Sequence, residues 1–370
     1  MSHLLAPPDY PAYLPQSPEE QSVAAGVRCL VILLVTLACA LVAPPAHAGE
    51  HARLGPLPQR VRHPLYLLHL QPTPGRAAVL MPGSVQVDVN GDWSNVFEKW
   101  SRFRPNGRQV SDLDMEIVRL ATQVRVGLPW GFEVGLEVPL ITMTGGVAER
   151  TIQNWHAALN AENGGRNFVE DFRFAWRVAV PDKFDHRITE PVVMALGDIT
   201  VDVQGQILRP SRRIPGVSGR FLVKLPTGVL ERGTGSGAPD VGVLLMAEHG
   251  WGFVNLYGQL GVLALGRTGQ LANILNPAAF TASFTLELNI TPHWSIVGQL
   301  HGHSTFLRGF AHRFMQRSPM AAMFGTRLQV GPMDLSLAME QDILNGDPSA
   351  DVSLVGSLGF TVGRRVRVGR

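Results

Sequence analysis

The sequence predicts an all-β fold, a transmembrane antiparallel up-and-down β-barrel of about twelve strands, preceded by a cleaved signal peptide. Three observations support this prediction. From about residue 83 onward, short segments alternate apolar and polar residues, as strands do when one face meets lipid and the other a lumen. The connections between these segments are short and long in strict turn. A short apolar run precedes all of them.

The first element is an expected export signal with a long leader at residues 1–48. An apolar run of about 14 residues reaches from Cys29 to Val42 and follows the single basic residue Arg28. Residues 46–48 (Ala-His-Ala) then give the small-x-small pattern that signal peptidases favour. The run is shorter than the roughly 20 apolar residues that span a bilayer. We therefore expect cleavage after Ala48 and export to the bacterial outer membrane.

The composition of the mature chain excludes several classes of function. Both cysteines, Cys29 and Cys39, lie inside the expected signal, which leaves no thiol for catalysis, zinc binding or a disulfide. Removing residues 1–48 takes away three acidic side chains and one basic one, so the formal charge rises from +2 to +4. That balance is too mild to indicate nucleic acid as a partner.

Residues 49–82 are expected to form an N-terminal periplasmic or plug segment. They contain the apolar run Leu65-Tyr66-Leu67-Leu68, which is not stable when it is fully exposed to water. One interpretation places the segment in the lumen or against the periplasmic rim. The other makes it an edge strand or a segment that docks a partner.

Residues 83–362 are expected to form the barrel. The alternation predicts strands near 85–97, 114–127, 131–142, 196–209, 217–226, 239–249, 251–265, 279–291, 293–304, 320–330, 333–342 and 351–362. Their number is even, as in single-chain bacterial barrels. In the hairpin around residue 129, a three-residue loop would set Arg125 directly across from Glu133, and such a pair helps to fix the register.

The connections separate two rims. Long ones are expected at 98–113, 143–195, 227–238, 266–278, 305–319 and 343–350, and short ones at 128–130, 210–216, 250, 292 and 331–332. The long outer loop 143–195 holds a plausible short helix at 155–159. Its alternating stretch 172–178 is either a strand of a hairpin within the loop or one of two further wall strands, which would make fourteen. A basic C-terminal tail follows at 363–370.

Polar residues on the alternating strands are the candidates for the lumen. They are Arg119, Gln123, Arg125, Glu133, Glu137, Arg220, Lys224, Glu287, Gln299, Arg327 and Glu340. Mixed charges of this kind would favour small polar solutes in an open channel, or would form an ionic network that fills a narrow barrel. The candidates for the aromatic girdles at the membrane interfaces are Trp93, Trp100, Trp130, Trp251 and Trp294.

Motifs that carry chemistry are weak. His301 and His303 share a strand face beside Ser304, but no third ligand is close in sequence, and a nucleophilic serine needs a base that a third group orients. Residues 233–237 (Gly-Thr-Gly-Ser-Gly) lack the Gly-Lys-Ser/Thr ending of a phosphate loop. We expect no catalytic residue, no metal site and no cofactor, and so no enzyme.

Short motifs along the chain carry a resemblance to a known family. They are Gly55–Leu57, Pro64–Leu70, Asp114–Glu116, Asn163–Arg166, Leu196–Asp198, Lys224–Gly228 and Gly235–Gly237 with Asp240. With them the chain resembles a bacterial family without assigned function, domain of unknown function 3187, over nearly all of the mature sequence. The resemblance implies an outer-membrane barrel and no established substrate or catalytic residue. The motifs at 224–228 and 235–237 also look like those of barrels linked to uptake of aromatic compounds.

These observations favour a passive channel or uptake pore for small solutes. Two alternatives stay open: a non-conducting structural or partner-binding barrel, and an outer-membrane lipid hydrolase. The expected partners are outer-membrane lipids, the barrel-assembly machinery and a small solute of unknown identity. The C-terminus departs from the usual pattern, because barrels commonly finish on an aromatic strand residue and here a basic tail follows Phe360.

Overall fold

The computed structural model describes residues 53–158, 166, 169–211, 213–310, 314–344 and 352–363. The expected signal with its cleavage site, residues 163–165 of one motif and residues 364–370 of the tail lie outside the described residues.

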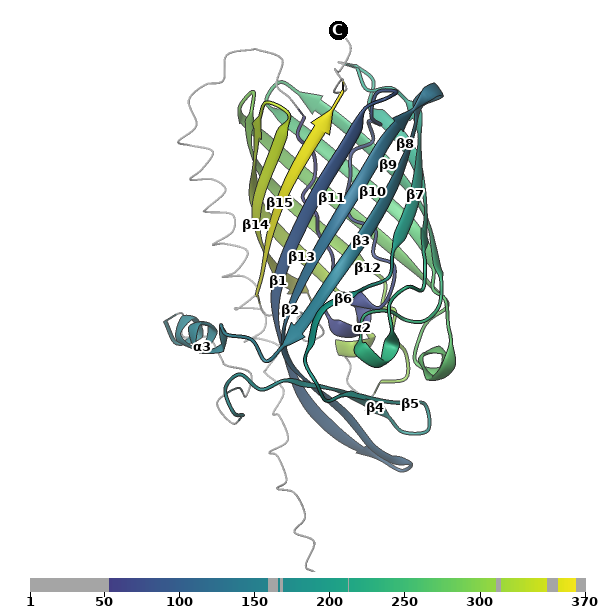
Figure 1. The fold of residues 1–370 in the computed structure, drawn as a ribbon, viewed down its shortest axis with the longest axis vertical. Helices are drawn as coiled ribbons and strands as arrows, with labels where there is room; N and C mark the ends of the chain where they lie inside the picture. The colour runs from purple at the N-terminus through teal and green to yellow at the C-terminus, as the bar shows by residue number, and fades with distance from the viewer. Residues whose placement is uncertain are drawn as a thin grey trace, which may run out of the picture. The chain divides into compact units, whose positions relative to one another are not determined.

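Twelve of the described strands close into an antiparallel barrel (Figure 1). They are β1 (Val85–Arg104), β2 (Gly107–Leu128), β3 (Phe132–Thr144), β7 (Thr200–Leu208), β8 (Gly216–Lys224), β9 (Asp240–Trp251), β10 (Val254–Ala264), β11 (Ala278–Thr291), β12 (Trp294–His303), β13 (Met320–Val330), β14 (Met333–Leu344) and β15 (Val352–Val362). Neighbours in the ring are neighbours in sequence, except that β7 follows β3. The pairing of β1 with β15, from Val85↔Val362 to Asn95↔Val352, closes the ring. The prediction of a twelve-stranded barrel is confirmed.

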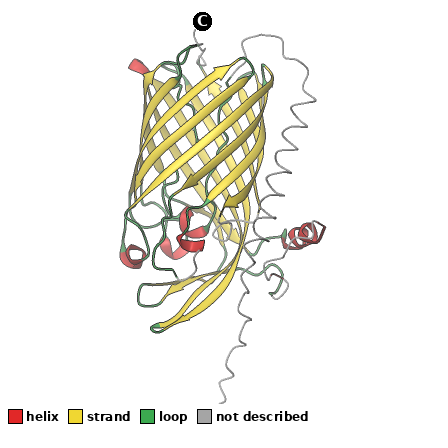
Figure 2. Cartoon of the chain, turned by 180° about the vertical axis from the view of Figure 1, so that it is seen from behind, coloured by secondary structure: helices red, strands yellow, loops and turns green. Residues whose placement is uncertain are grey.

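The register follows from the alternation of side chains. On β11, Phe280 and Phe284 point outward and are 68% and 49% exposed, whereas Thr285 and Glu287 point inward and are buried. A slip of one residue would exchange these two faces, so the pattern fixes the pairing. Figure 2 shows strands forming the wall and loops and short helices at its ends. We call these ends the short-turn end, where β1 begins, and the loop end.

The hairpin of β2 and β3 pairs differently from the prediction. A short 3₁₀ turn, η1 (Pro129–Gly131), joins Leu128 to Phe132. Arg125 therefore lies across from Gly135, not from Glu133. The ion pair still forms diagonally, with 3.4 Å between Arg125 Nη1 and Glu133 Oε1, because the arginine side chain is long enough to reach the next inward position.

The prediction of a long connection at 98–113 is wrong. Strands β1 and β2 continue past the barrel to a two-residue turn at 105–106 and form a projecting arm. The partner that sustains it comes from the long outer loop: β4 (Ala175–Val180) pairs with residues 110–114 of β2, and β5 (Phe184–Ile188) pairs with β4. A pairing between segments so far apart in sequence leaves no local signal.

The long outer loop also contains α3 (Glu149–Ala158) and β6 (Val192–Leu196), which pairs with β3. Strands β4 and β5 form a hairpin of the loop, so the alternative of fourteen wall strands is wrong. The remaining short helices are α2 (Pro64–Leu67), η3 (Leu230–Arg232), η4 (Gly269–Asn273) and η5 (Phe314–Gln316). Among the described residues, no helix is long and apolar enough to cross a membrane.

Candidate functional site in the barrel interior

The most informative feature of the interior is the chain segment inside it, residues 53–82, which we call the inner segment (Figure 1). Its first part contacts β11, β12 and β13, its middle forms α2 near the loop end, and its last part returns along β9, β7 and β3 to the start of β1. The interior of the barrel therefore holds two passes of chain. Most of the polar contacts in the interior join wall side chains to groups of this segment.

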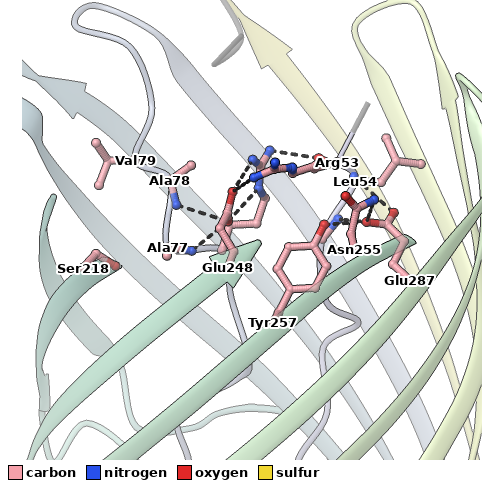
Figure 3. Close-up of polar contacts among 12 residues, drawn as sticks. Arg53, Leu54, Ala77, Ala78, Val79, Ser218, Glu248, Asn255, Tyr257 and Glu287 are labelled. Atoms are coloured by element: carbon pink, nitrogen blue, oxygen red, sulfur yellow. Dashed lines mark hydrogen bonds and ion pairs between the residues drawn. The ribbon is translucent and has the colours of Figure 1, made fainter. Parts of the chain in front are cut away.

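Near the short-turn end, Glu248 of β9 binds both passes (Figure 3). Its carboxylate accepts from Arg76 Nη2 at 2.9 Å and from the backbone N–H of Ala77 at 3.0 Å and of Ala78 at 3.3 Å. Arg53 Nη1 lies 3.6 Å from Glu248 Oε1. The carboxylate is fully buried, so these donors replace the water that it loses.

Glu287 of β11 is the second buried carboxylate at this end (Figure 3). Its oxygens accept from the backbone N–H of Leu54 at 3.1 Å and from Ser295 Oγ at 2.8 Å. The hydroxyl of Tyr257 and the amide of Asn255 donate to it as well. A fixed cage of donors thus holds the start of the inner segment to β11.

At mid-height, Gln299 of β12 binds the backbone of the inner segment as a neighbouring strand would. It accepts from the N–H of Leu57 at 3.0 Å and donates to the carbonyl of Leu57 at 2.9 Å. The side chain of Leu57 packs into a small apolar cluster on the inner wall, which is formed by Val297, Met323, Ala338 and Val355.

Arginines of the inner segment pair with carboxylates on the wall. Arg60 lies 3.3 Å from Glu137 of β3, which Arg119 of β2 also binds. Arg62 binds Asp92 of β1 and Glu340 of β14. Charges that are paired in this way can be buried.

At the loop end, several of the family-like motifs meet around one lysine. Lys224 of β8 binds Asp198, lies 3.3 Å from Asp240 Oδ2, and donates to the carbonyl of Leu68 at 3.0 Å. Asp240 in turn accepts from the N–H of Leu70 at 2.7 Å. The motifs at 196–198, 224–228 and 235–240 therefore hold the backbone of the inner segment just after α2.

The tip of the inner segment packs against the outer loops. α2 begins at Pro64, where the ring of His63 accepts from the N–H of Leu65 at 3.2 Å. The ring of Tyr66 lies 4.9 Å from those of His303 and Phe306, measured between centroids. Burial raises the pKa of Tyr66 to about 12, because the phenolate would lose its hydration.

The structure places most predicted lumen residues in buried positions on inner strand faces, and all of these side chains have polar contacts in the interior except Gln123, for which no contact is described. Buried are Arg119, Gln123, Glu133, Arg220, Lys224, Glu287, Gln299 and Glu340, and partly buried are Arg125, Glu137 and Arg327. Arg220 pairs with Asp202, Glu133 accepts from the N–H of Leu80, and Arg327 donates to the carbonyls of Gly55 and Pro56.

Sequence reasoning missed the partners of these residues. It omitted the wall carboxylates Asp92, Asp202 and Glu248, and all four arginines of the inner segment, which are Arg53, Arg60, Arg62 and Arg76. A signal was present for the wall carboxylates, since each stands at an inward position of its strand. The segment arginines follow no period from which a contact could be inferred.

The five tryptophans that the sequence assigned to the girdles fall into two groups. Trp130, Trp251 and Trp294, at the short turns, are 90%, 57% and 40% exposed. Trp93 and Trp100 each donate from the indole to a glutamate, Glu116 at 2.9 Å and Glu98 at 2.6 Å. The first group faces outward at one rim, and the second is tied to the base of the arm.

The remaining candidates for chemistry are held in structural contacts. The ring of His303 stacks on Phe306, with 4.3 Å between centroids, and Ser304 Oγ accepts from the N–H of Phe280 at 2.9 Å. The described residues contain no group of three or more His, Cys, Asp or Glu side chains that could hold a metal ion. In the loop at 233–237, the N–H of Ser236 donates to Asp198.

Comparison with known proteins gives a family and a fold. A family model described as "Protein of unknown function (DUF3187)" matches residues 31–362. Among curated proteins, no match is found. The crystal structure of an outer membrane channel from Pseudomonas putida F1 superposes with a TM-score of 0.51 at 10% identity, covering 79% of this chain and all of that chain (100%). KdgM porin (TM-score 0.37, 7% identity, 76% and 99% covered) and the CymD monoaromatic hydrocarbon channel (0.33, 9%, 77% and 90%) are more distant.

Proposed function

The chain belongs to the DUF3187 family of proteins of unknown function, and we propose that it is an outer-membrane channel for small solutes, closed in this structure by the inner segment. Its barrel fold is shared with the Pseudomonas putida channel. The outward strand faces support the membrane location. Leu245, Leu260 and Phe280 are 54%, 64% and 68% exposed, and a belt of such residues around the barrel suits lipid and not water.

One observation carries the proposal of a channel: the lumen is wide enough to hold two passes of chain, and the wall binds them mainly through polar groups. Barrels of eight strands are filled by their own side chains, and those of sixteen or more leave an aqueous pore. With twelve strands, the space that the inner segment occupies would become a water-filled passage if it left. Water and ions could then bind Glu248, Glu287 and Gln299 in its place.

Planar-bilayer recording tests this proposal. Deleting residues 53–80 should raise the single-channel conductance several-fold over that of the full-length protein, because the two passes of chain no longer occupy the lumen. Heat-modifiable gel mobility must show that the deleted protein still forms a barrel. Equal conductance of two folded proteins would contradict the proposal.

A non-conducting barrel is the second candidate, and one observation favours it. At the loop end, the tip of the inner segment and the outer loops share one apolar cluster, which includes Leu65, Tyr66, Phe306 and Phe310. Such a cluster is a stable seal. Recording of the full-length protein separates the two functions, since a channel must pass current when its own inner segment moves, whereas a structural barrel would pass current only after the segment is deleted.

A further inference from the structure

Three polar side chains of the inner wall form a row that the inner segment does not bind. Gln259 of β10 pairs in register with Ser283 of β11, and Ser283 pairs with His301 of β12. All three stand at inward positions, so their side chains are neighbours on one face, about 5 Å apart from strand to strand. We call them the polar row.

The outer members of the polar row are buried without partners. Gln259 is 2% exposed and His301 is 1% exposed. Among the described residues, neither polar atom of the Gln259 amide and neither ring nitrogen of His301 has a hydrogen-bond partner. Buried polar groups are nearly always bonded. Nearby Glu287 and Gln299, on the same wall, have several partners each.

The central member of the row is accessible. Ser283 is partly exposed, whereas its inward neighbours on β11, Thr281 and Thr285, are buried. The inner segment thus leaves Ser283 partly uncovered on the inner face of the wall.

The two passes of the inner segment lie on either side of the row. On one side, Gln59 donates to the carbonyl of Ala321, which pairs with His301. On the other side, a Cβ at Gly75 would lie 3.1 Å from the side chain of Met246, which pairs with Gln259. The row therefore faces the part of the lumen between the two passes.

We propose that the polar row binds a neutral polyhydroxylated solute, such as a monosaccharide, and this deepens the proposed channel function by naming its solute class. An amide, a hydroxyl and an imidazole together offer donors and acceptors, as the hydroxyl groups of a sugar require. The row itself contains no acidic or permanently charged side chain, and the nearby Arg60 and Arg62 are already paired with wall carboxylates. A charged solute would lose its hydration there without compensation.

Saturation-transfer NMR on the full-length protein in detergent tests the binding, with glucose as the probe and gluconate as the charged comparison. Glucose should receive saturation and gluconate should not. Ser283→Ala, Gln259→Leu and His301→Leu should each weaken glucose binding about five-fold, which corresponds to a lost hydrogen bond of about 1 kcal/mol. Ser336→Ala is the matched control, because its hydroxyl lies on the inner wall away from the row and contacts Ser357.

The outcomes separate this inference from the channel. Glucose binding that the row variants lose, in a protein that passes no current, supports the row and contradicts the channel. Current without any glucose binding overturns the row and leaves the channel standing. Folded row variants that bind glucose as the wild type does would also overturn it. Three independent variants keep the test decisive if one of them fails to fold.

Discussion

The legs and the tip of the inner segment are held in place by different kinds of interaction. Its legs, residues 53–62 and 71–82, are bound mainly by hydrogen bonds and ion pairs, with Glu248 and Glu287 as the principal acceptors. Its tip, residues 63–70, places Leu65, Tyr66, Leu68 and Leu70 in the apolar cluster of the outer loops. Water can replace polar contacts at modest net cost, whereas it cannot replace apolar packing.

This difference indicates which end controls opening. If the segment moves, we expect the legs to exchange their contacts for water and the tip to resist. The polar cluster of Lys224, Asp198 and Asp240 also fixes the position of the tip, because it binds the backbone at Leu68 and Leu70. In this view the tip is the lock, which means the part that must be released before the segment can move.

The largest expected effect is at the tip. Tyr66→Ala removes a fully buried ring that contacts His303 and Phe306, and truncations of this kind cost about 3–5 kcal/mol. We expect the free energy of unfolding in detergent, from urea titration, to fall by that amount and the conductance to rise. Phe280→Ala is the control, since its ring is 68% exposed on the outside. Unchanged stability and conductance in Tyr66→Ala would rule out the tip as the lock.

A pH dependence sharpens the same point without removing the ring. The pKa of Tyr66 is raised to about 12 in the fold, against about 10 in an unfolded chain. The unfolded state therefore loses its proton first as the pH rises. The contribution of neutral Tyr66 to the free energy of unfolding is fully present below pH 10. It falls by about 2–3 kcal/mol as the pH rises from about 10 to about 12.

Tyr66→Phe is the matched variant, because it keeps the ring and removes the titrating hydroxyl. The loss of stability between these two pH values should be smaller in the variant than in the wild type by the amount given above. Identical pH profiles of the two proteins would show that Tyr66 does not titrate as its burial implies.

The barrel could be predicted from the sequence because its information is local. Alternation assigned the strands, and the rule of short and long connections placed the rims. The arm could not be predicted, since β2 pairs there with β4, which lies more than sixty positions away in sequence. No pattern within residues 107–114 indicates that partner. The diagonal pair of Arg125 and Glu133 shows a smaller failure: the charges pointed to the contact, but the turn at Pro129–Gly131 set the register.

The interior site was only half predictable for a similar reason. Inward residues such as Glu287 and Gln299 follow from the period of two. Their partners, the backbone groups of Leu54 and Leu57, lie in a segment with no period, so the sequence left its placement open. The motifs at 196–198, 224–228 and 235–240 meet in space through one lysine, which a linear pattern does not reveal.

The smallest expected effect is at the legs. Glu248→Gln keeps an oxygen for the N–H of Ala77 but loses the charge that Arg76 and Arg53 face. Since the Arg76 side chain is 25% exposed, solvent screens part of the loss, and we expect a cost of about 1–2 kcal/mol. Glu231→Gln, at an exposed carboxylate of η3, is the control and should cost nothing measurable. Because the tip still holds, the conductance of Glu248→Gln should rise less than that of Tyr66→Ala. A larger rise in conductance in Glu248→Gln than in Tyr66→Ala would show that the legs, and not the tip, are the lock.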